Sequence, residues 1–294
     1  MASLRDARFP ALIAGSVLVA WHPLLELFKL TLHSDEYTQI LLVLPISIAL
    51  ISVQWRSERL LTRTSFAAGG TLLSAAIFVA AFSRWGLAFL SSDFHLMMEI
   101  LAVVIWWIGS FVLCFGTKVS RAMLFPLCFL FWIVPLPAVA LNELIKFLQY
   151  GSARAAEALF AVAGVPVVQN GLLISIPDLT VQVAKECSSI RSSLMLVVTT
   201  MVLAYLLLRS PWRRLLVIAI SLPLSIAKNG LRIFTIAILG TRVDPGYLNG
   251  RFHHQGGIVF FAISLLIIFL LLWVLQRGEK PGVENRSLKS ALPC

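Results

Sequence analysis

Three residues whose side chains could together cleave and transfer an acyl group stand in the carboxyl-terminal half of the chain. Cys187 comes just before one long apolar run, Arg232 lies inside the next, and His253 comes just before the last. A thiolate is a strong nucleophile, a guanidinium stabilises a developing oxyanion, and an imidazole moves protons. These residue types therefore predict nucleophilic cysteine chemistry.

A lone cysteine in a membrane protein usually serves packing, so the sequence around Cys187 matters. Ser188 and Ser189 are good helix N-cap residues, and an apolar run begins just after them. A helix that starts there places the thiol at the positive end of the helix dipole, where the thiolate is favoured. Arg191, about one turn further on, adds positive charge. We therefore expect Cys187 to be reactive.

Arg232 needs an explanation, because a charge inside an apolar run costs several kcal/mol unless it is paired or faces a polar cavity. One interpretation is an anchor whose guanidinium reaches up to the membrane surface. The other is a polar helix face. Asn229 and Ser225 precede Arg232 by three and seven residues, and Lys228 belongs near the same face.

His253 and His254 come just before the last apolar run. Alone, such a pair is more often a hydrogen-bonded surface feature or a weak metal site than a catalytic base. The metal interpretation lacks a third ligand with suitable spacing, since Glu186 and Asp244 are the only candidates. No G-x-S-x-G serine motif and no H-E-x-x-H zinc motif is present. We expect a cysteine nucleophile with a histidine base, either His253 or His254, and no metal or cofactor.

The composition is that of a membrane protein. Of 294 residues, 59% are hydrophobic and 13% are charged, whereas soluble domains carry roughly a quarter charged residues. The mean hydropathy is +0.90. The formal net charge of +10 comes largely from Lys and Arg in short loops between apolar runs. That placement fits the positive-inside rule better than a nucleic-acid-binding surface, so no nucleic-acid partner is expected.

The four cysteines show no C-x-x-C motif and no zinc-like spacing with His, so neither a disulfide framework nor a metal site is indicated. Cys114 and Cys128 lie inside apolar runs, where packing as small core hydrophobes is the expected role. Cys294 is the last residue, which is the wrong place for a prenylation motif. Cys187 is thus the one thiol expected to react.

Apolar runs long enough to cross a bilayer recur about eight times. They cover approximately residues 10–30, 39–54, 65–82, 97–116, 122–137, 192–208, 215–239 and 257–276. The sequence predicts an all-α polytopic membrane protein. Basic loops near Arg63, Lys118 and Arg209 are expected on the cytoplasmic side together with both chain ends. Cys187 and His253 then lie at the outer face.

The connection between the fifth and sixth runs differs from the others. From Leu141 to Ala163, apolar residues recur at helical spacing with charged residues between them, which predicts an amphipathic helix along the outer membrane surface. β-favouring residues from Val165 to Ile176 flank Asn170-Gly171, a two-residue turn signal, and predict a short β-hairpin before the cysteine. We expect one integral-membrane domain over residues 1–277 and a polar cytoplasmic tail over residues 278–294.

At these residues the sequence resembles the exosortase/archaeosortase family of polytopic cysteine transpeptidases. The resemblance rests on three motifs in order, with an apolar run between each: Glu186-Cys187-Ser188-Ser189-Ile190-Arg191, Asn229-Gly230-Leu231-Arg232-Ile233, and His253 followed by Gly257 and Phe260-Phe261. It extends upstream through Pro135-Leu136-Pro137 and Ala163-Gly164-Val165-Pro166-Val167. It thereby covers most of the chain after about Asp35. The family's catalytic Cys, Arg and His map onto Cys187, Arg232 and His253.

The resemblance implies a substrate and a mechanism. The partners would be exported proteins whose carboxy-terminal sorting signal has a short motif, Pro-Glu-Pro in the best-known type, then one transmembrane helix and a basic cluster. Cys187 would attack the scissile carbonyl, Arg232 would stabilise the oxyanion, and His253 would protonate the leaving amine. The thioester would pass to water or to an acceptor such as an amine. The implied location is the cytoplasmic (inner) membrane of a bacterium, beside the envelope polysaccharide machinery.

Three other classes of function remain open from the sequence. A transporter could bind an anionic solute with Arg232 and Asn229, and would tolerate Cys187→Ser. A membrane acyltransferase would use His253 with Asn229 and would not need the thiol. A structural partner in an envelope-polysaccharide complex would keep its function when all three residues of the proposed catalytic set are replaced.

Overall fold

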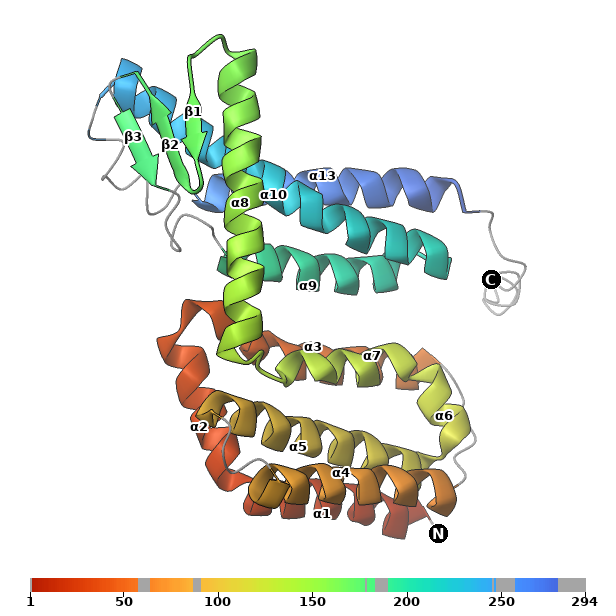
Figure 1. Ribbon diagram of the computed structural model, residues 1–294. Helices are drawn as coiled ribbons and strands as arrows, with labels where there is room; N and C mark the ends of the chain where they lie inside the picture. Colours follow the sequence, from red (N-terminus) through yellow and green to blue (C-terminus); the bar gives the residue numbers. More distant parts are fainter. Residues whose placement is uncertain are drawn as a thin grey trace, which may run out of the picture. The chain divides into compact units, whose positions relative to one another are not determined.

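The computed structural model describes residues 2–57, 64–86, 91–177, 179–182, 190–244, 246 and 257–279. It is mostly helical, and its contacts divide it into two compact units, Met1–Glu143 and Leu144–Cys294 (Figure 1). Six of the described helices are long and apolar enough to cross a membrane, and the number is eight if each of two bent helix pairs is one span. The all-α polytopic prediction is confirmed, while the single domain over residues 1–277 stays a prediction.

The first unit is made of helices connected by short breaks. In chain order they are α1 (Ala2–Val19), α2 (Trp21–His33), the 3₁₀ helix η1 (Asp35–Tyr37), α3 (Ile40–Ser57), α4 (Phe66–Gly86), α5 (Ser92–Phe115), α6 (Thr117–Ala122), α7 (Leu124–Phe129), the 3₁₀ helix η2 (Leu130–Ile133) and the first turns of α8 (Ala138–Val162). Helices α3, α4 and α5 agree with the expected second, third and fourth runs.

The expected first run, residues 10–30, is a bent pair rather than one straight helix. Helices α1 and α2 meet at Ala20 with a bend of 77°. Pro23 stands in the first turn of α2. Its ring clashes with the carbonyl four residues earlier, at Val19, and it has no N–H to bond that carbonyl. The helix therefore ends at Val19 and starts again in a new direction.

A break with the same physical cause precedes the expected fifth run, between α6 and α7, and the run itself ends at Ile133 in a 98° bend before α8. Pro126 cannot donate to the carbonyl of Ala122, and α6 ends there. Instead, Gln54 Nε2 of α3 donates to the Ala122 carbonyl at 2.8 Å. Ser47 Oγ, also from α3, donates to the Pro126 carbonyl at 2.6 Å. Polar side chains of one apolar helix thus satisfy the backbone groups that the break exposes.

The two described cysteines lie in this unit and differ in exposure. Cys114 of α5 is 2% exposed, as expected for a small core residue. Cys128 of α7 is exposed, so the prediction that it packs in the core is wrong. Helix α7 has six residues, and Pro126, Leu127 and Phe129 form its buried side. Cys128 falls on the opposite side, which an apolar sequence alone does not distinguish.

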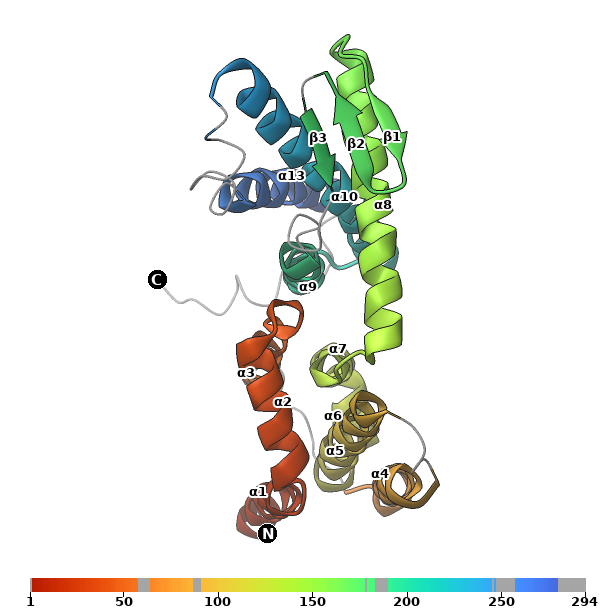
Figure 2. The same cartoon turned by 60° about the vertical axis from the view of Figure 1, so that its left-hand side comes forward.

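The second unit contains the rest of α8, a small sheet and three long helices. They are β1 (Val168–Asn170), β2 (Leu173–Ile176), β3 (Leu179–Gln182), α9 (Ile190–Leu207), α10 (Pro211–Arg242) and α13 (Gly257–Arg277). The sheet is antiparallel in the order β1-β2-β3. In both views it lies beside the carboxyl-terminal half of α8 (Figures 1 and 2).

The expected hairpin is present, with its turn shifted by one residue. Asn170 pairs with Leu173, so Gly171 and Leu172 form the loop instead of Asn170 and Gly171. Gly171 has a φ of 64°, a left-handed conformation that glycine adopts without steric cost. The third strand, β3, pairs with β2 in the register Ile176↔Leu179 and was not predicted.

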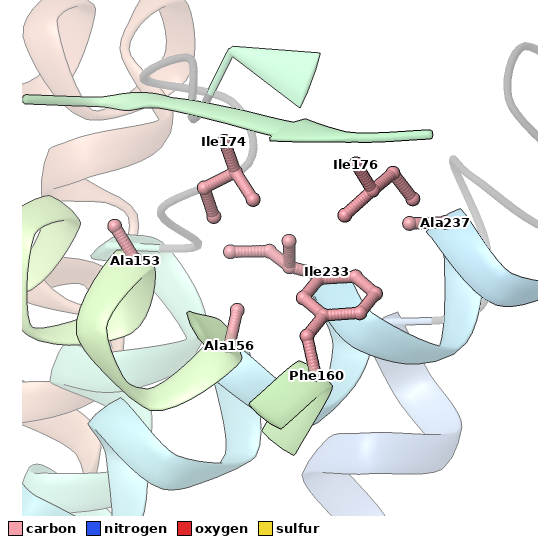
Figure 3. Close-up of a cluster of buried hydrophobic side chains, with 7 residues drawn as sticks. All are labelled: Ala153, Ala156, Phe160, Ile174, Ile176, Ile233 and Ala237. Atoms are coloured by element: carbon pink, nitrogen blue, oxygen red, sulfur yellow. The ribbon is translucent and has the colours of Figure 1, made fainter. Parts of the chain in front are cut away.

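The inner face of the sheet packs on α8 and α10. Figure 3 shows Ile174 and Ile176 of β2 pointing toward Phe160 of α8 and Ile233 of α10. Seven buried residues make up this cluster: Ala153, Ala156, Phe160, Ile174, Ile176, Ile233 and Ala237. The helical prediction for Leu141–Ala163 is therefore confirmed. Its buried stripe contacts protein, whereas its placement along a membrane surface stays a prediction.

Helices α9, α10 and α13 pack side by side around a second apolar cluster that includes Leu196, Val217 and Ile268. Only 22% of α13 is buried although its hydropathy reaches 3.2, which suits a helix with most of its surface in lipid.

Hydrogen bonds lock the start of α10 to the end of α13. The Glu279 carboxylate accepts from the backbone N–H groups of Arg209 at 2.9 Å and Ser210 at 2.9 Å. In return, the Arg213 guanidinium donates to the carbonyls of Leu275 and Gly278.

Candidate functional site

The candidate site is built on one buried polar stripe of α10. Its members recur at helical spacing and are each at most 8% exposed: Ser221, Ser225, Lys228, Asn229 and Arg232. A polar face of this kind inside a helix of membrane-spanning length needs partners from neighbouring helices. The expected stripe of Ser225, Asn229 and Arg232 is thus present, and Lys228 belongs to it.

The first turn of α9 supplies partners for the middle of the stripe. Ser225 Oγ donates to Ser193 Oγ at 2.6 Å. Lys228 Nζ donates to Ser192 Oγ at 2.5 Å. Both serines lie within four residues of Ile190, where α9 begins. The start of α9 is therefore held against the middle of α10.

Helix α8 supplies the partner of Asn229. Asn229 Nδ2 donates to Ser152 Oγ at 3.0 Å, and within the described part of the chain its buried Oδ1 has no hydrogen-bond partner. The two helices cross closely here. A Cβ added to Gly230 would lie 2.5 Å from the Ala155 Cβ and 3.0 Å from the Ala156 nitrogen. Glycine at this position is what allows Asn229 to reach Ser152.

The start of α13 lies next to the two cations. A Cβ built on Gly257 would be 3.9 Å from the Arg232 guanidinium carbon. Lys228 Nζ lies 5.9 Å from the centre of the Phe261 ring, one turn into the same helix. At this distance a Cβ would be in ordinary van der Waals contact with the guanidinium, so the first residue of α13 lies directly beside Arg232.

The resulting arrangement gathers positive charge. The amino-terminal ends of α9 and α13 both meet α10 at Lys228 and Arg232, and the amino-terminal end of a helix carries a partial positive charge. Two side-chain cations stand beside these two helix ends. Such a site is suited to stabilising an anion, whether a thiolate, an oxyanion or a carboxylate.

Among the expected site residues, Asn229 and Arg232 lie on the same buried face of α10. Arg191 lies in the first turn of α9, and its side chain is exposed, unlike that of Arg232. Cys187, Ser188, His253 and His254 lie outside the described residues.

Three serines of the site were not predicted: Ser152, Ser192 and Ser193. Ser192 and Ser193 follow Arg191 directly, and a hydroxyl pair at the start of an apolar run is a signal that could have been used. Ser152 follows Gly151, and a Cβ on Gly151 would lie 3.0 Å from Ile226 side-chain atoms. Small residues at close helix crossings are typical of membrane proteins.

Comparison with known proteins gives one match. The family model described as transmembrane exosortase (Exosortase_EpsH) matches residues 31–270. That range includes every residue of the candidate site. No curated protein and no solved structure matches the chain.

Proposed function

The chain belongs to the transmembrane exosortase family, and from this membership we propose that it is a cysteine transpeptidase that cleaves the carboxy-terminal sorting signals of exported proteins. Membership itself implies a multi-pass membrane protein that processes sorting signals. The catalytic residues, the bond cleaved and the fate of the product belong to the proposal.

Cys187 is the proposed nucleophile. Its thiolate attacks the carbonyl carbon of the scissile peptide bond, and the carbonyl oxygen becomes an oxyanion. The Arg232 guanidinium offers a planar set of donors to that oxyanion. Burial of Arg232 supports this role, because hydrogen bonds to an anion gain strength where water is excluded.

His253 is the proposed acid that completes cleavage, with His254 as the alternative. When the carbon–nitrogen bond breaks, the imidazolium transfers its proton to the leaving amine, and the acyl group stays on Cys187 as a thioester. Water or an amine acceptor then attacks the thioester and regenerates the thiol. Asn229 and Ser188 are proposed to support the geometry, and Arg191 to favour the thiolate.

The observation that supports this site best is the meeting of the two helix starts at α10. Cys187 precedes Ile190, the first residue of α9, by three residues, and His253 precedes Gly257, the first residue of α13, by four. A chain of three or four residues spans at most roughly 10 to 14 Å. Both helix starts contact the Lys228–Arg232 turn. Tethers of this length would allow the thiol and the imidazole to reach Arg232, which supports the proposed catalytic set.

The proposal includes a location. The basic loops favour cytoplasmic chain ends and a site on the outer face of a bacterial cytoplasmic membrane. Exported proteins would reach it there, held in the bilayer by the transmembrane helix of their sorting signal. The envelope polysaccharide machinery is the proposed setting.

The test uses an exported reporter that ends in a short motif, a transmembrane helix and a basic cluster. Co-expression with the wild-type chain is expected to trim the reporter, and mass spectrometry of the product identifies the cleaved bond. Cys187→Ala is expected to abolish trimming. The matched control replaces Cys114, Cys128 and Cys294 with Ser together and is expected to keep it. Continued trimming by Cys187→Ala would exclude the covalent mechanism and would favour the transporter or acyltransferase alternatives.

A further inference from the structure

We infer that the outer edge of β3 binds the sorting motif of the substrate as an added β-strand and so holds the scissile bond beside Cys187. This rests on the proposed function and deepens it, because it names the element that binds the peptide backbone. It also gives a role to a strand that the chemistry of the catalytic set does not use.

The register of the sheet indicates which backbone groups β3 directs outward. Ile176 and Leu179 pair across a connection of two residues, and residues that close such a connection exchange backbone hydrogen bonds. Bonded and non-bonded pairs alternate along antiparallel strands, so Leu179 and Val181 bond to β2. Thr180 and Gln182 therefore direct their N–H and C=O groups to the other side of β3.

The first hairpin supports this assignment. Asn170 and Leu173 close its two-residue loop, so Leu173 and Ser175 bond to β1. That leaves Ile174 and Ile176 of β2 to bond to β3, as the register of the second hairpin requires. β3 is the last strand in the order β1-β2-β3, and among the described residues no further strand pairs with it. A strand edge of this kind is a template for another strand.

The sheet is packed on the helix that carries Arg232. Figure 3 shows the two isoleucines of β2 pointing toward Ile233, the residue that follows Arg232 in α10. Leu179 of β3 packs against the same cluster. Because side chains alternate along a strand, Thr180 lies on the opposite face, where it is exposed. A peptide on this edge would thus be held by the same packed elements that hold the proposed oxyanion donor.

Two features favour the sorting motif as the added strand. β3 ends at Gln182, and Cys187 follows five residues later, at most roughly 18 Å along an extended chain. Pairing with a strand edge also holds a peptide extended, with the carbonyls of alternate residues directed away from the sheet. A scissile carbonyl in such a peptide is open to attack by a thiolate.

Photocrosslinking from Thr180 tests where the peptide binds. A photoreactive residue replaces Thr180 in the Cys187→Ala chain, which leaves the exported reporter uncleaved. We expect a crosslink that mass spectrometry maps to the short motif of the reporter. Val168, 69% exposed in β1 at the opposite edge of the sheet, is the control position and is expected to give much less. No crosslink from Thr180, or an equal one from Val168, would overturn the inference.

Thr180→Pro tests the backbone contact in the chain that keeps Cys187. Proline lacks the N–H that the added strand would use, and an edge strand tolerates it where that N–H faces away from the sheet. We expect trimming to fall about two- to tenfold at low reporter levels, as for loss of one hydrogen bond, and to recover at high levels. Thr180→Val keeps the N–H and is the control, expected to trim as the wild type does. Wild-type trimming by Thr180→Pro, or equal losses in both variants, would overturn the inference.

Failure of the proposed function gives a different result. If the wild-type chain does not trim the reporter in a Cys187-dependent way, the proposed function fails. If it does, and Thr180 gives no crosslink, only the strand addition is wrong. Where Thr180→Pro does not accumulate in the membrane, the crosslink from Thr180 decides.

Discussion

At the scale of single residues, neutral groups hold Lys228, namely the Ser192 hydroxyl and the Phe261 ring, and Gly257 lies beside Arg232. Neutral contacts that fix a cation suit a site that stabilises a transient anion. A guanidinium and an ammonium differ in such a setting, because one is a planar set of donors and the other a mobile point charge.

Arg232→Lys tests that difference. If Arg232 only anchors the helix at the membrane surface, Lys should serve nearly as well. If it binds the oxyanion, loss of a well-placed donor is expected to slow trimming by about 10²- to 10³-fold at normal membrane abundance. The measurement is the rate of reporter trimming against protein level. Arg154→Lys, at an exposed arginine of α8, is the control and should trim at the wild-type rate. Equal rates in both variants would restore the anchor interpretation.

Site residues that are close to one another in the sequence could be predicted to lie together, and residues that are far apart in the sequence could not. Asn229 and Arg232 lie three residues apart, so the helical period alone places them on one face. The Asn229–Ser152 bond joins residues 77 positions apart, and the Lys228–Ser192 bond joins residues 36 apart. Such pairs follow from how helices cross, and a local pattern does not contain that information.

At the scale of elements, the same limit explains the errors of the sequence analysis. Apolar runs predicted the long helices well, because length and hydropathy are local properties. Pro23 and Pro126 were given too little weight, although each removes a backbone donor and ends a helix. β3 was missed because four residues are too few for the alternation of Leu179-Thr180-Val181-Gln182 to stand out.

Gly230→Ala tests the close crossing of α8 and α10. The added methyl group meets Ala155 and the backbone of Ala156, which cannot move aside without shifting a helix. Overpacking of this kind typically costs about 1 to 3 kcal/mol. We expect a lower apparent melting temperature in detergent and weaker trimming. Gly70→Ala is the control, because a Cβ there meets nothing within 4 Å. A wild-type melting temperature for Gly230→Ala would contradict the tight crossing.

The hydrogen bonds that the Glu279 carboxylate accepts at the start of α10 should make the stability of the protein depend on pH. Burial opposes ionisation of its carboxyl, but hydrogen bonds from the backbone of Ser210 and Arg209 and the charges of Arg213 and Arg209 outweigh it and lower the pKa. A lowered pKa in the folded state means that the stabilisation is complete above the ordinary carboxyl pKa of about 4.3. It is lost as pH falls through the lowered pKa.

Glu279→Ala is therefore expected to lower the apparent melting temperature at pH 7 by roughly 2 to 4 °C, as for loss of a helix cap worth about 1 kcal/mol. The difference from wild type should shrink as the pH is lowered below about 4. Thermal scans of the purified protein across this range make the comparison. Gln276→Ala, an exposed change near the end of α13, is the control. A difference that stays constant with pH would show that the carboxylate charge does not matter.

At the scale of the whole molecule, the alternation of basic loops predicts which side of the membrane each loop occupies. Reporter fusions at about Arg63, Ser120 and Arg209 are expected to report cytoplasm, and fusions at about Gln169 and Tyr247 the outer side. A cytoplasmic signal at Gln169 alone would separate Cys187 from the face where exported proteins arrive. The family match over residues 31–270 spans both compact units, so both are expected to be needed for trimming.

The buried polar stripe of α10 makes insertion of this helix into the membrane costly. A Lys or Arg at the centre of a span costs about 2.5 to 3.5 kcal/mol on translocon scales, against roughly 0.3 to 0.6 gained for each Leu, Ile, Phe or Val. α10 carries Lys228 and Arg232 together, and α9, which is synthesised first, holds the hydroxyl that accepts from Lys228.

We expect α10 alone to insert poorly in a glycosylation-based insertion assay, and the α9–α10 pair to insert efficiently. Replacing both Lys228 and Arg232 with Leu should rescue the isolated helix. Efficient insertion of unmodified α10 by itself would contradict this. Lys228 and Arg232 would thus make α10 depend on α9 during membrane insertion. Both helices would have to be synthesised before α10 enters the bilayer.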